Sequence, residues 1–269
     1  MNIIKLKEIA KQIRRDIVTM TGTARVAHSG SALSAVDALT ALYFNFMKLN
    51  PKKPNWPGRD RFILSKGHAA TALYAALANR GFFKKEKLKT FAQNGSHLTC
   101  HPSIQNVPGV EATTGALGHG LSIGVGMALA GKRDNNKHNI YVMISDGECD
   151  EGSVWEAVLF AGHHKLNNLT IIVDYNKIQS FGRTAEVLDL EPLTEKFKAF
   201  NWWTKEVDGH NLGELLSVLK EAKKIKNQPQ CLIAHTVKGK GVSFMEDRLE
   251  WHYWSPSGDL LKKALEELA

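Results

Sequence analysis

Apolar residues recur at helical spacing near the start of the chain. Ile9, Ile13 and Ile17 follow one another at intervals of four, as residues on one face of a helix do. Positions 36–46 repeat this pattern, and prolines between positions 51 and 57 then break it. A short apolar run at 62–64 predicts a strand, and the alanine-rich stretch 69–78 predicts a helix. We therefore expect two helices before the first strand.

The middle of the chain alternates strands with helices. Residues 140–144 and 169–173 are continuous apolar runs, as in strands that are buried on both faces. A helical pattern at 154–165 separates them, and strand–helix–strand units make parallel sheets with right-handed crossovers. The later pattern predicts a strand at 203–207, a helix at 212–224 and a strand at 231–235. We therefore expect an α/β fold, with an open, mostly parallel sheet flanked by helices.

Nothing in the pattern divides the chain. We find no internal repeat, no low-complexity linker and no clean boundary in composition. The length of 269 residues is enough for one large α/β core. We therefore expect residues 1–269 to form a single domain.

The charge, the apolar stretches and the cysteines indicate the cellular compartment and the classes of partner. The formal net charge is +8, but the basic residues are dispersed, and the densest cluster, 84–89, fits a solvated helix face. The longest nearly apolar stretch, 121–130, is too short to span a bilayer, and no secretory signal pattern is present. Three scattered cysteines suggest a reducing compartment. We expect a cytoplasmic protein that binds neither nucleic acid nor membrane.

Two of the predicted strands end in polar residues that suit a metal and a phosphate. The first runs into Asp146-Gly147, and the second runs toward Asn176. Parallel strands end at one edge of the sheet, which is where open α/β sheets bind ligands. A carboxylate, an amide oxygen and a nearby carbonyl form a partial shell for a hard cation. Gly147 allows close approach of a phosphate, and the following helix points its N-terminus toward it. Each fragment alone would be read as a turn or a cap, so the pairing carries the prediction.

Histidines supply the second signal. His28, His68 and His101 lie beside glycine, serine or proline in predicted loops, and His252 lies in a Trp-His-Tyr segment. A lone loop histidine is more often a surface residue than a catalyst. Four such residues indicate a polar pocket that moves protons near neutral pH.

Two other sites were weighed against these. Gly118, Gly120 and Gly124 superficially resemble a dinucleotide fingerprint, but no convincing strand precedes them, so close helix packing explains them better. The segment containing His97, Cys100 and His101 lacks a matched second pair of zinc ligands. The adjacent histidines 163 and 164, inside a predicted helix, are interpreted as one inward and one outward residue.

Together these residues resemble a known family. Asp146-Gly147, followed by Asn176, is similar to the thiamine diphosphate signature. Further segments resemble transketolases in particular, in the order of that family and over nearly the whole chain: 61–69, 108–115, 117–120, 174–178 and 238–246.

The resemblance implies a thiamine-diphosphate-binding fold and a set of cofactor contacts. Asp146, Asn176 and the carbonyl of Ile178 would hold the divalent metal, Mg²⁺ (or Ca²⁺ or Mn²⁺). Gly147, His68 and His252 would contact the diphosphate. The backbone groups of Gly115 and Leu117 would contact the aminopyrimidine ring. Glu151 would belong to an acidic network at the subunit interface.

The resemblance also assigns the histidines and the reaction. His28 and His101 would bind the ketose oxygens and assist proton transfer, with His68 and His252 facing the substrate as well. The reaction would transfer a two-carbon ketol unit from a ketose phosphate, or a related anionic sugar, to an aldose. Family members often have proline after the first histidine and glycine after the last. Ser29 and Tyr253 stand there in this chain, which leaves the histidines in place and alters the substrate mouth.

The length of the chain implies a partner. It stops where a one-chain transketolase continues into the domain that carries the glutamate for the aminopyrimidine ring. The chain therefore resembles the N-terminal subunit of a split transketolase, completed by a C-terminal subunit in an assembly of two copies of each. Leu117, Leu121 and Ile178 are candidates for that interface.

Two alternatives remain at this stage. One is another thiamine-dependent enzyme, similar to 1-deoxyxylulose-5-phosphate synthase or to the α-subunit of a 2-oxo acid dehydrogenase. The other is a non-catalytic chain that only binds the cofactor or stabilises a partner. The histidine set favours transketolase, because ketose hydroxyls need several hydrogen-bond partners.

Overall fold

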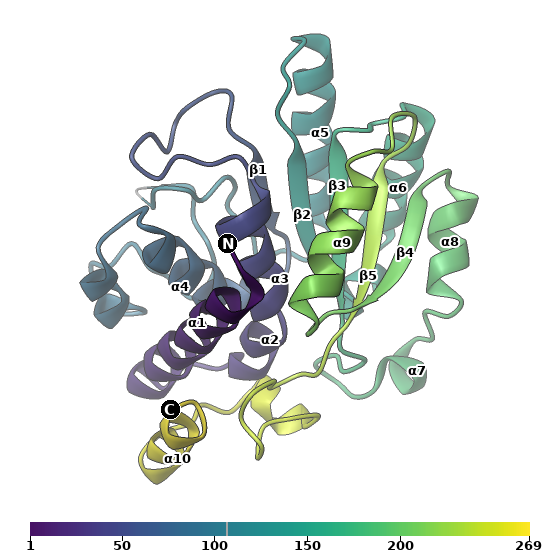
Figure 1. The fold of residues 1–269 in the computed structure, drawn as a ribbon. Helices are drawn as coiled ribbons and strands as arrows, with labels where there is room; N and C mark the ends of the chain where they lie inside the picture. Colours follow the sequence, from purple (N-terminus) through teal and green to yellow (C-terminus); the bar gives the residue numbers. More distant parts are fainter. Residues whose placement is uncertain (106) are drawn as a thin grey trace.

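A five-stranded parallel sheet runs through the protein. The computed structural model describes residues 1–105 and 107–269. The strands lie in the order β1-β2-β3-β5-β4, and every neighbouring pair is parallel (Figure 1). This confirms the expected α/β fold and each predicted strand, which are β1 Arg61–Leu64, β2 Ile140–Ser145, β3 Leu169–Tyr175, β4 Trp203–Asp208 and β5 Gln230–His235.

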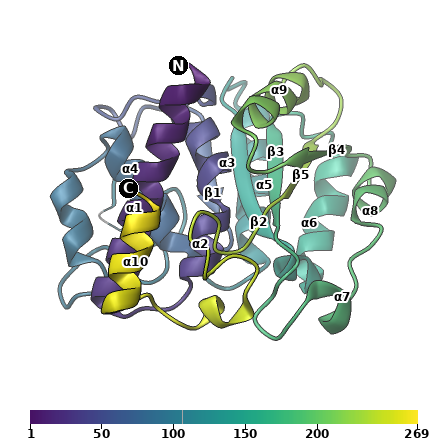
Figure 2. The same cartoon turned by 60° about the horizontal axis from the view of Figure 1, so that its bottom comes forward.

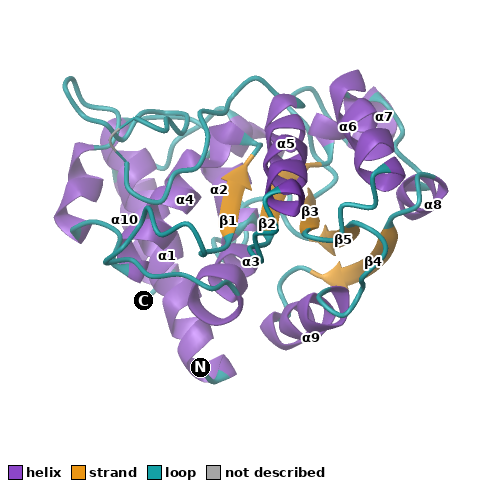
Figure 3. Ribbon diagram, turned by 90° about the horizontal axis from the view of Figure 1, so that it is seen from above, coloured by secondary structure: helices purple, strands orange, loops and turns teal. Residues whose placement is uncertain are grey.

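Helices cover both faces of this sheet (Figure 3). Successive side chains of a strand point to opposite faces, so the apolar runs feed two hydrophobic cores. Tyr141 and Met143 of β2 pack into the first core, whereas Val142 and Ile144 pack into the second. The continuous apolar runs in the sequence are thus explained by burial on both faces.

The first core is enclosed by helices from both ends of the chain. Ile13 and Ile17 of the predicted first helix are fully buried in it. Figure 2 shows the last helix lying beside the first, although the two are far apart in sequence. The helices on this side are α1 Ile3–Ala24, α2 Ser29–Ser34, α3 Val36–Ala41, α4 Ala70–Arg80, α9 Leu212–Ala222 and α10 Asp259–Glu267.

The second core lies under α5 His119–Arg133, α6 Gly152–His163 and α8 Leu193–Ala199. Glycine lets α5 approach the sheet closely, because a methyl group at Gly124 would come within 2.5 Å of the Val142 side chain. Close helix packing therefore accounts for this glycine.

The helical pattern at 36–46 is interrupted. It begins as α3 and widens into a π-turn, η1 Leu42–Phe46. The C-terminal α10 was not predicted, although Arg15 of α1 donates hydrogen bonds to the carbonyls of Leu265 and Leu268 there. The remaining short helices are η2 Gly67–Ala69, η3 Lys85–Thr90, η4 Gly147–Asp150, α7 Thr184–Val187 and η5 Leu249–His252.

Within the part of the chain that the structure describes, no helix combines the length and the apolar character needed to cross a membrane.

Candidate active site

A pocket of about 240 Å³ lies at the carboxyl edge of the sheet. The loops that follow β1, β2 and β3 contribute to it, together with residues from the start of α2, the segment before α5 and the end of η5. Every predicted site residue except Glu151 lines it. The lining residues are His28, Ser31, His68, His101, Gly115, Leu117, Ser145, Asp146, Gly147, Asn176, Ile178, Gln179, Ser180 and His252.

The four histidine rings gather on one side of this pocket. The ring centre of His28 lies 5.3 Å from that of His68, 5.0 Å from that of His252 and 6.4 Å from that of His101. His28 has left-handed backbone angles, with φ 75°, which is unusual for a residue with a side chain. Its backbone N–H donates to the carbonyl of His252 at 3.0 Å, so the two ends of the chain meet here.

Burial keeps the imidazoles of His28, His68 and His252 neutral. It lowers the pKa of His28 to about 4, with further contributions from His101, Lys238 and Lys66. Burial and the charge of Lys238 lower the pKa of His252 to about 3, and burial also lowers the pKa of His68. A neutral imidazole offers one donor and one acceptor nitrogen, so each ring can bind a hydroxyl and relay a proton.

The oxygens predicted to bind a metal lie together at the ends of β2 and β3. Asp146 accepts hydrogen bonds from the backbone N–H groups of Gly147 at 2.8 Å and Lys177 at 2.5 Å. Asn176 accepts one from the N–H of Ile178 at 3.1 Å. These bonds fix the orientation of both side chains.

Burial makes this carboxylate suited to a cation. Burial and the nearby charge of Asp174 raise the pKa of Asp146 to about 7. A divalent cation would offset that cost of burying negative charge. The Ile178 carbonyl accepts a hydrogen bond from Lys238 at 3.1 Å, and its second lone pair is left for a metal. The residues present therefore fit a metal bound through oxygen, with phosphate and water completing its shell.

Glycine shapes another wall of the pocket. Gly115 has φ 144°, a conformation that favours glycine, and a methyl group there would come within 3.0 Å of the His101 ring. A methyl group at Gly67 would come within 2.7 Å of the Gly115 nitrogen. These contacts bring the backbone of 114–117 close to the histidines. The backbone groups there can contact the flat ring of a bound ligand.

Beneath the pocket lies a set of buried charges that sequence reasoning missed. Lys66 is fully buried and Asp174 is 1% exposed, and the two form an ion pair. Lys66 also donates to the carbonyl of Ser31 at 2.9 Å, and Asp174 accepts from Ser34 at 2.7 Å and Thr236 at 2.5 Å. Burial acts to raise the pKa of Asp174, but the charge of Lys66 and the hydrogen bonds from Lys66, Ser34 and Thr236 together outweigh it, so the net shift is downward.

Two further buried charges belong to the same region. Lys238 is fully buried and donates to the Ile178 carbonyl at 3.1 Å and to Nδ1 of His252 at 2.9 Å. Burial and the charge of Lys66 lower the pKa of Lys238 to about 8. Glu148 accepts hydrogen bonds from Ser65 and from the backbone N–H groups of Gly118 and Ser145. Lys66 and Lys238 stand inside glycine-containing segments of the family resemblance, which was the available signal.

Some predictions about the surroundings of the pocket were wrong. Leu121 and Ile178, expected at an exposed interface, are 0% and 4% exposed because they pack inside the chain. His163 and His164 are both exposed, since they lie at the C-terminal end of α6. Glu151, predicted for an acidic network at the subunit interface, is exposed at the start of α6 and lies outside the pocket lining, and its interface role stays a prediction. Large exposed apolar side chains lie elsewhere, at Ile104, Ile123, Leu159, Phe160, Phe181, Leu188, Tyr253 and Trp254 among other positions.

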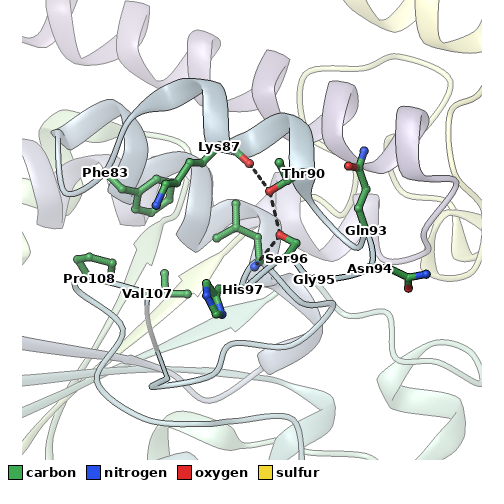
Figure 4. A pocket seen from close by; sticks show the side chains of 11 residues that line it. Phe83, Lys87, Thr90, Gln93, Asn94, Gly95, Ser96, His97, Val107 and Pro108 are labelled. Carbon is green, nitrogen blue, oxygen red and sulfur yellow. Dashed lines mark hydrogen bonds between the residues drawn. The ribbon is translucent and has the colours of Figure 1, made fainter.

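His97 and His101, two of the candidate zinc ligands, line different hollows. Figure 4 shows His97 beside Val107 in the first of these, whereas His101 lines the histidine pocket. The Thr90 hydroxyl there bonds to the Lys87 carbonyl at 2.9 Å and to the Ser96 hydroxyl at 2.8 Å. Among residues 1–105 and 107–269, no group of three or more His, Cys, Asp or Glu side chains could hold a metal ion. The proposed metal shell contains only one such side chain.

Known proteins match the chain over nearly its whole length. Residues 5–261 match the family described as transketolase, thiamine diphosphate binding domain. The 6-deoxy-6-sulfo-D-fructose transketolase subunit SqwG of Clostridium sp. (strain MSTE9) is 44% identical over 98% of this chain and 96% of that protein. An apulose-4-phosphate transketolase subunit of Phocaeicola vulgatus is 40% identical over 100% of this chain and 95% of that protein.

Solved transketolases match the fold as well. The crystal structure of transketolase from Campylobacter jejuni superimposes with a TM-score of 0.94 at 35% identity, covering 100% of this chain and 43% of that one. The chain thus spans less than half of that solved transketolase. The mouse transketolase is 38% identical over 92% of this chain and 39% of its own length. The chain belongs to the transketolase family, as a subunit that corresponds to the thiamine diphosphate binding domain.

Proposed function

We propose that this chain acts with a partner subunit to transfer a two-carbon ketol unit from an anionic ketose to an aldose. One observation carries the proposal: the metal-suited oxygens of Asp146, Asn176 and Ile178 share a pocket with four histidines. A phosphate-bearing cofactor on the first set would bring a sugar against the second. We treat residues 1–269 as one functional unit.

Thiamine diphosphate with Mg²⁺, Ca²⁺ or Mn²⁺ is the cofactor we propose for the pocket. It would supply a carbanion that attacks the ketose carbonyl and an electron sink for the cleaved bond. Asp146, Asn176 and the Ile178 carbonyl would hold the metal, and Gly147 would allow the diphosphate to approach the backbone. The backbone groups of Gly115 and Leu117, which line the pocket, would contact the aminopyrimidine ring.

The histidines would hold the sugar and move its protons. His28 and His101 are proposed to bind the ketose hydroxyls and carbonyl oxygen. His68 and His252 would face both the diphosphate and the substrate. The lowered pKa values of His28, His68 and His252 support this, because a neutral imidazole can accept a proton from one hydroxyl and donate to another oxygen.

The partner is proposed to complete the site. Relatives named as transketolase subunits support a two-chain enzyme, most simply two copies of each chain with the active sites at their interfaces. Glu151, exposed beside the pocket, would join an acidic network at that interface. The named relatives act on a sulfonated and on a phosphorylated sugar, which supports an anionic ketose donor. Free cysteines support a reducing compartment such as the cytoplasm.

Mixing the chain with its partner subunit tests this function. We expect ketol transfer that depends on thiamine diphosphate and Mg²⁺ in the mixture and none with the chain alone. The donor panel should include 6-deoxy-6-sulfo-D-fructose, apulose 4-phosphate and fructose 6-phosphate. Asp146→Ala should abolish cofactor binding measured by calorimetry while leaving the circular dichroism spectrum unchanged. Turnover by the chain alone that matches the mixture, or unchanged affinity in Asp146→Ala, would refute the proposal.

A further inference from the structure

Two segments of the pocket wall are fastened to each other. One is the turn after β3, residues 178–183, which is closed by a bridge between Ile178 and Arg183 and by a hydrogen bond from the Gln179 N–H to the Gly182 carbonyl at 2.9 Å. The other is residues 247–253, which include η5. Ser180 of the turn and His252 of η5 both line the pocket, so the spacing of the two segments affects what the pocket can hold.

Three ties join these segments. The innermost is the fully buried Lys238, which binds both the Ile178 carbonyl and Nδ1 of His252. The next is a hydrogen bond from the Tyr253 hydroxyl to the Ser180 carbonyl at 2.8 Å. The outermost is the ion pair of Arg183 with Asp247 at 2.6 Å, whose side chains are 45% and 59% exposed.

Tyr253 contacts a pocket residue at each end of its side chain. Its hydroxyl holds Ser180, and its ring centre lies 5.0 Å from that of His252, at an edge-on angle. The residue is 54% exposed, so burial in a core does not explain these contacts. The Tyr253 side chain therefore acts as a spacer between the turn and the histidine.

The neighbouring backbone supports the same segment from the other side. The His28 N–H donates to the His252 carbonyl at 3.0 Å, and the Ser29 hydroxyl donates to the Trp254 carbonyl at 3.4 Å. Because η5 is held in this way, a change at Tyr253 should displace the turn more than the histidine.

We propose that Tyr253 is a positioning residue that sets the spacing between Ser180 and His252 and so selects among ketose donors. This inference rests on the proposed function. Two predicted metal ligands, Asn176 and Ile178, lie at the inner end of the turn, where Lys238 and the hydrogen bond from Ile178 to Asn176 hold them without Tyr253. The third, Asp146, is held by the backbone N–H groups of Gly147 and Lys177. Loosening the outer end should therefore weaken donor selection and leave cofactor binding intact.

The test compares Tyr253→Phe with Arg183→Gln in the two-chain enzyme. Tyr253→Phe keeps the ring and removes only the bond to Ser180, whereas Arg183→Gln loosens the same two segments farther from the pocket. The donors are xylulose 5-phosphate, fructose 6-phosphate and sedoheptulose 7-phosphate, which differ in chain length. A second readout is hydrogen exchange of residues 179–183 in the chain alone.

For Tyr253→Phe we expect the KM of the preferred donor to rise about threefold to tenfold, the effect of losing one net hydrogen bond. The KM differences among donors should shrink, with kcat and the half-saturating thiamine diphosphate concentration staying within about twofold. Exchange at 179–183 should accelerate. Arg183→Gln should leave every donor KM within about twofold, because exposed ion pairs contribute little.

Several results would overturn the inference. These are an unchanged donor KM in Tyr253→Phe, a parallel loss of cofactor affinity, or an equal rise in KM in Arg183→Gln. Failure of the wild-type mixture to transfer any ketol unit would instead overturn the proposed function, and donor selection with it. The exchange measurement would still report whether Tyr253 holds the turn.

Discussion

The charged layer beneath the pocket and the histidines above it are built in opposite ways. Below, Lys66, Asp174 and Glu148 are almost wholly buried, and each makes several hydrogen bonds. Above, the rings of His28, His68 and His101 make no side-chain hydrogen bond to any residue in the described ranges 1–105 and 107–269. The lower layer therefore stabilises the fold, whereas the ring nitrogens of these three histidines are free to bind a substrate.

The comparison separates two kinds of polar residue that look alike in a sequence. A buried charge with a full set of partners stabilises the fold only while every partner is present, because removing one partner leaves the other charge buried and unpaired. A ring that packs against other rings without a hydrogen bond can be removed at little cost to the fold. Substitutions in the two layers should consequently affect different measurements.

The largest expected effect is in the lower layer. Lys66→Met should lower the free energy of unfolding by about 3–5 kcal/mol, because it leaves Asp174 buried without its cation. Urea unfolding followed by circular dichroism measures this change. The control is Lys262→Met, which breaks an exposed pair with Asp259 and should change stability by less than about 1 kcal/mol. Equal losses in the two variants would show that the buried pair does not stabilise the fold.

The matching change among the histidines should spare the fold. His101 is exposed and its ring has no hydrogen bond to a described residue, so His101→Ala should change the free energy of unfolding by less than about 1 kcal/mol. Ketol transfer by the two-chain enzyme should fall by about 10²-fold, as expected on losing a proton-transfer group. Steady-state kinetics and urea unfolding of one preparation give both values. A His101→Ala enzyme that is strongly destabilised but retains full activity would contradict the assignment of His101 to the substrate site.

Glu148 should respond more mildly than Lys66. Glu148→Gln keeps the shape but presents an amide group where the carboxylate accepts bonds from Ser65 and two backbone N–H groups. We expect a loss of about 1–3 kcal/mol, the cost of leaving buried donors unsatisfied. Glu86→Gln, on the exposed side of η3, is the matched control and should be neutral. Thermal unfolding distinguishes them, and a neutral Glu148→Gln would remove this residue from the stabilising layer.

Lowering the pH should act on the upper layer through His28. The pKa of His28 falls from 6.5 to about 4 on folding, so the unfolded chain binds more protons between these values. The stabilisation is present above pH 6.5 and is lost as the pH falls through 4. Wild-type stability should therefore fall more steeply than that of His28→Asn over this range. Denaturant unfolding at several pH values measures the two slopes, and parallel slopes would contradict the prediction.

The sequence predicted the strands and the upper layer better than the lower one. Strands such as β2 and β3 could be identified because burial on both faces demands an unbroken apolar run. Asp146 and Asn176 could be placed together because parallel strands end at one edge. The approach of the histidines depended on the family resemblance, because spacing along the chain does not say which loops meet.

The lower layer had no such pattern. Lys66 and Asp174 lie 108 positions apart, and neither has a periodic neighbour that marks it as buried. Their contact joins the loop after β1 to the end of β3, which only the folded chain brings together. Leu121 and Ile178 were expected at the surface because the sequence does not show whether an apolar residue near a loop faces the solvent or the interior of the chain.

The parallel sheet also has a consequence for synthesis of the chain. Arg61 of β1 pairs with Ile140 of β2, so the first strand has no neighbour until a long later segment has left the ribosome. At about 5–20 residues per second, that delay is roughly 4–16 seconds, and an unpaired apolar strand is a hazard for aggregation while it lasts. Since each pairing in this sheet joins parallel strands, no local hairpin can shorten the delay. Lower growth temperatures and abundant chaperones should therefore raise the yield of folded chain more than stabilising its finished structure would.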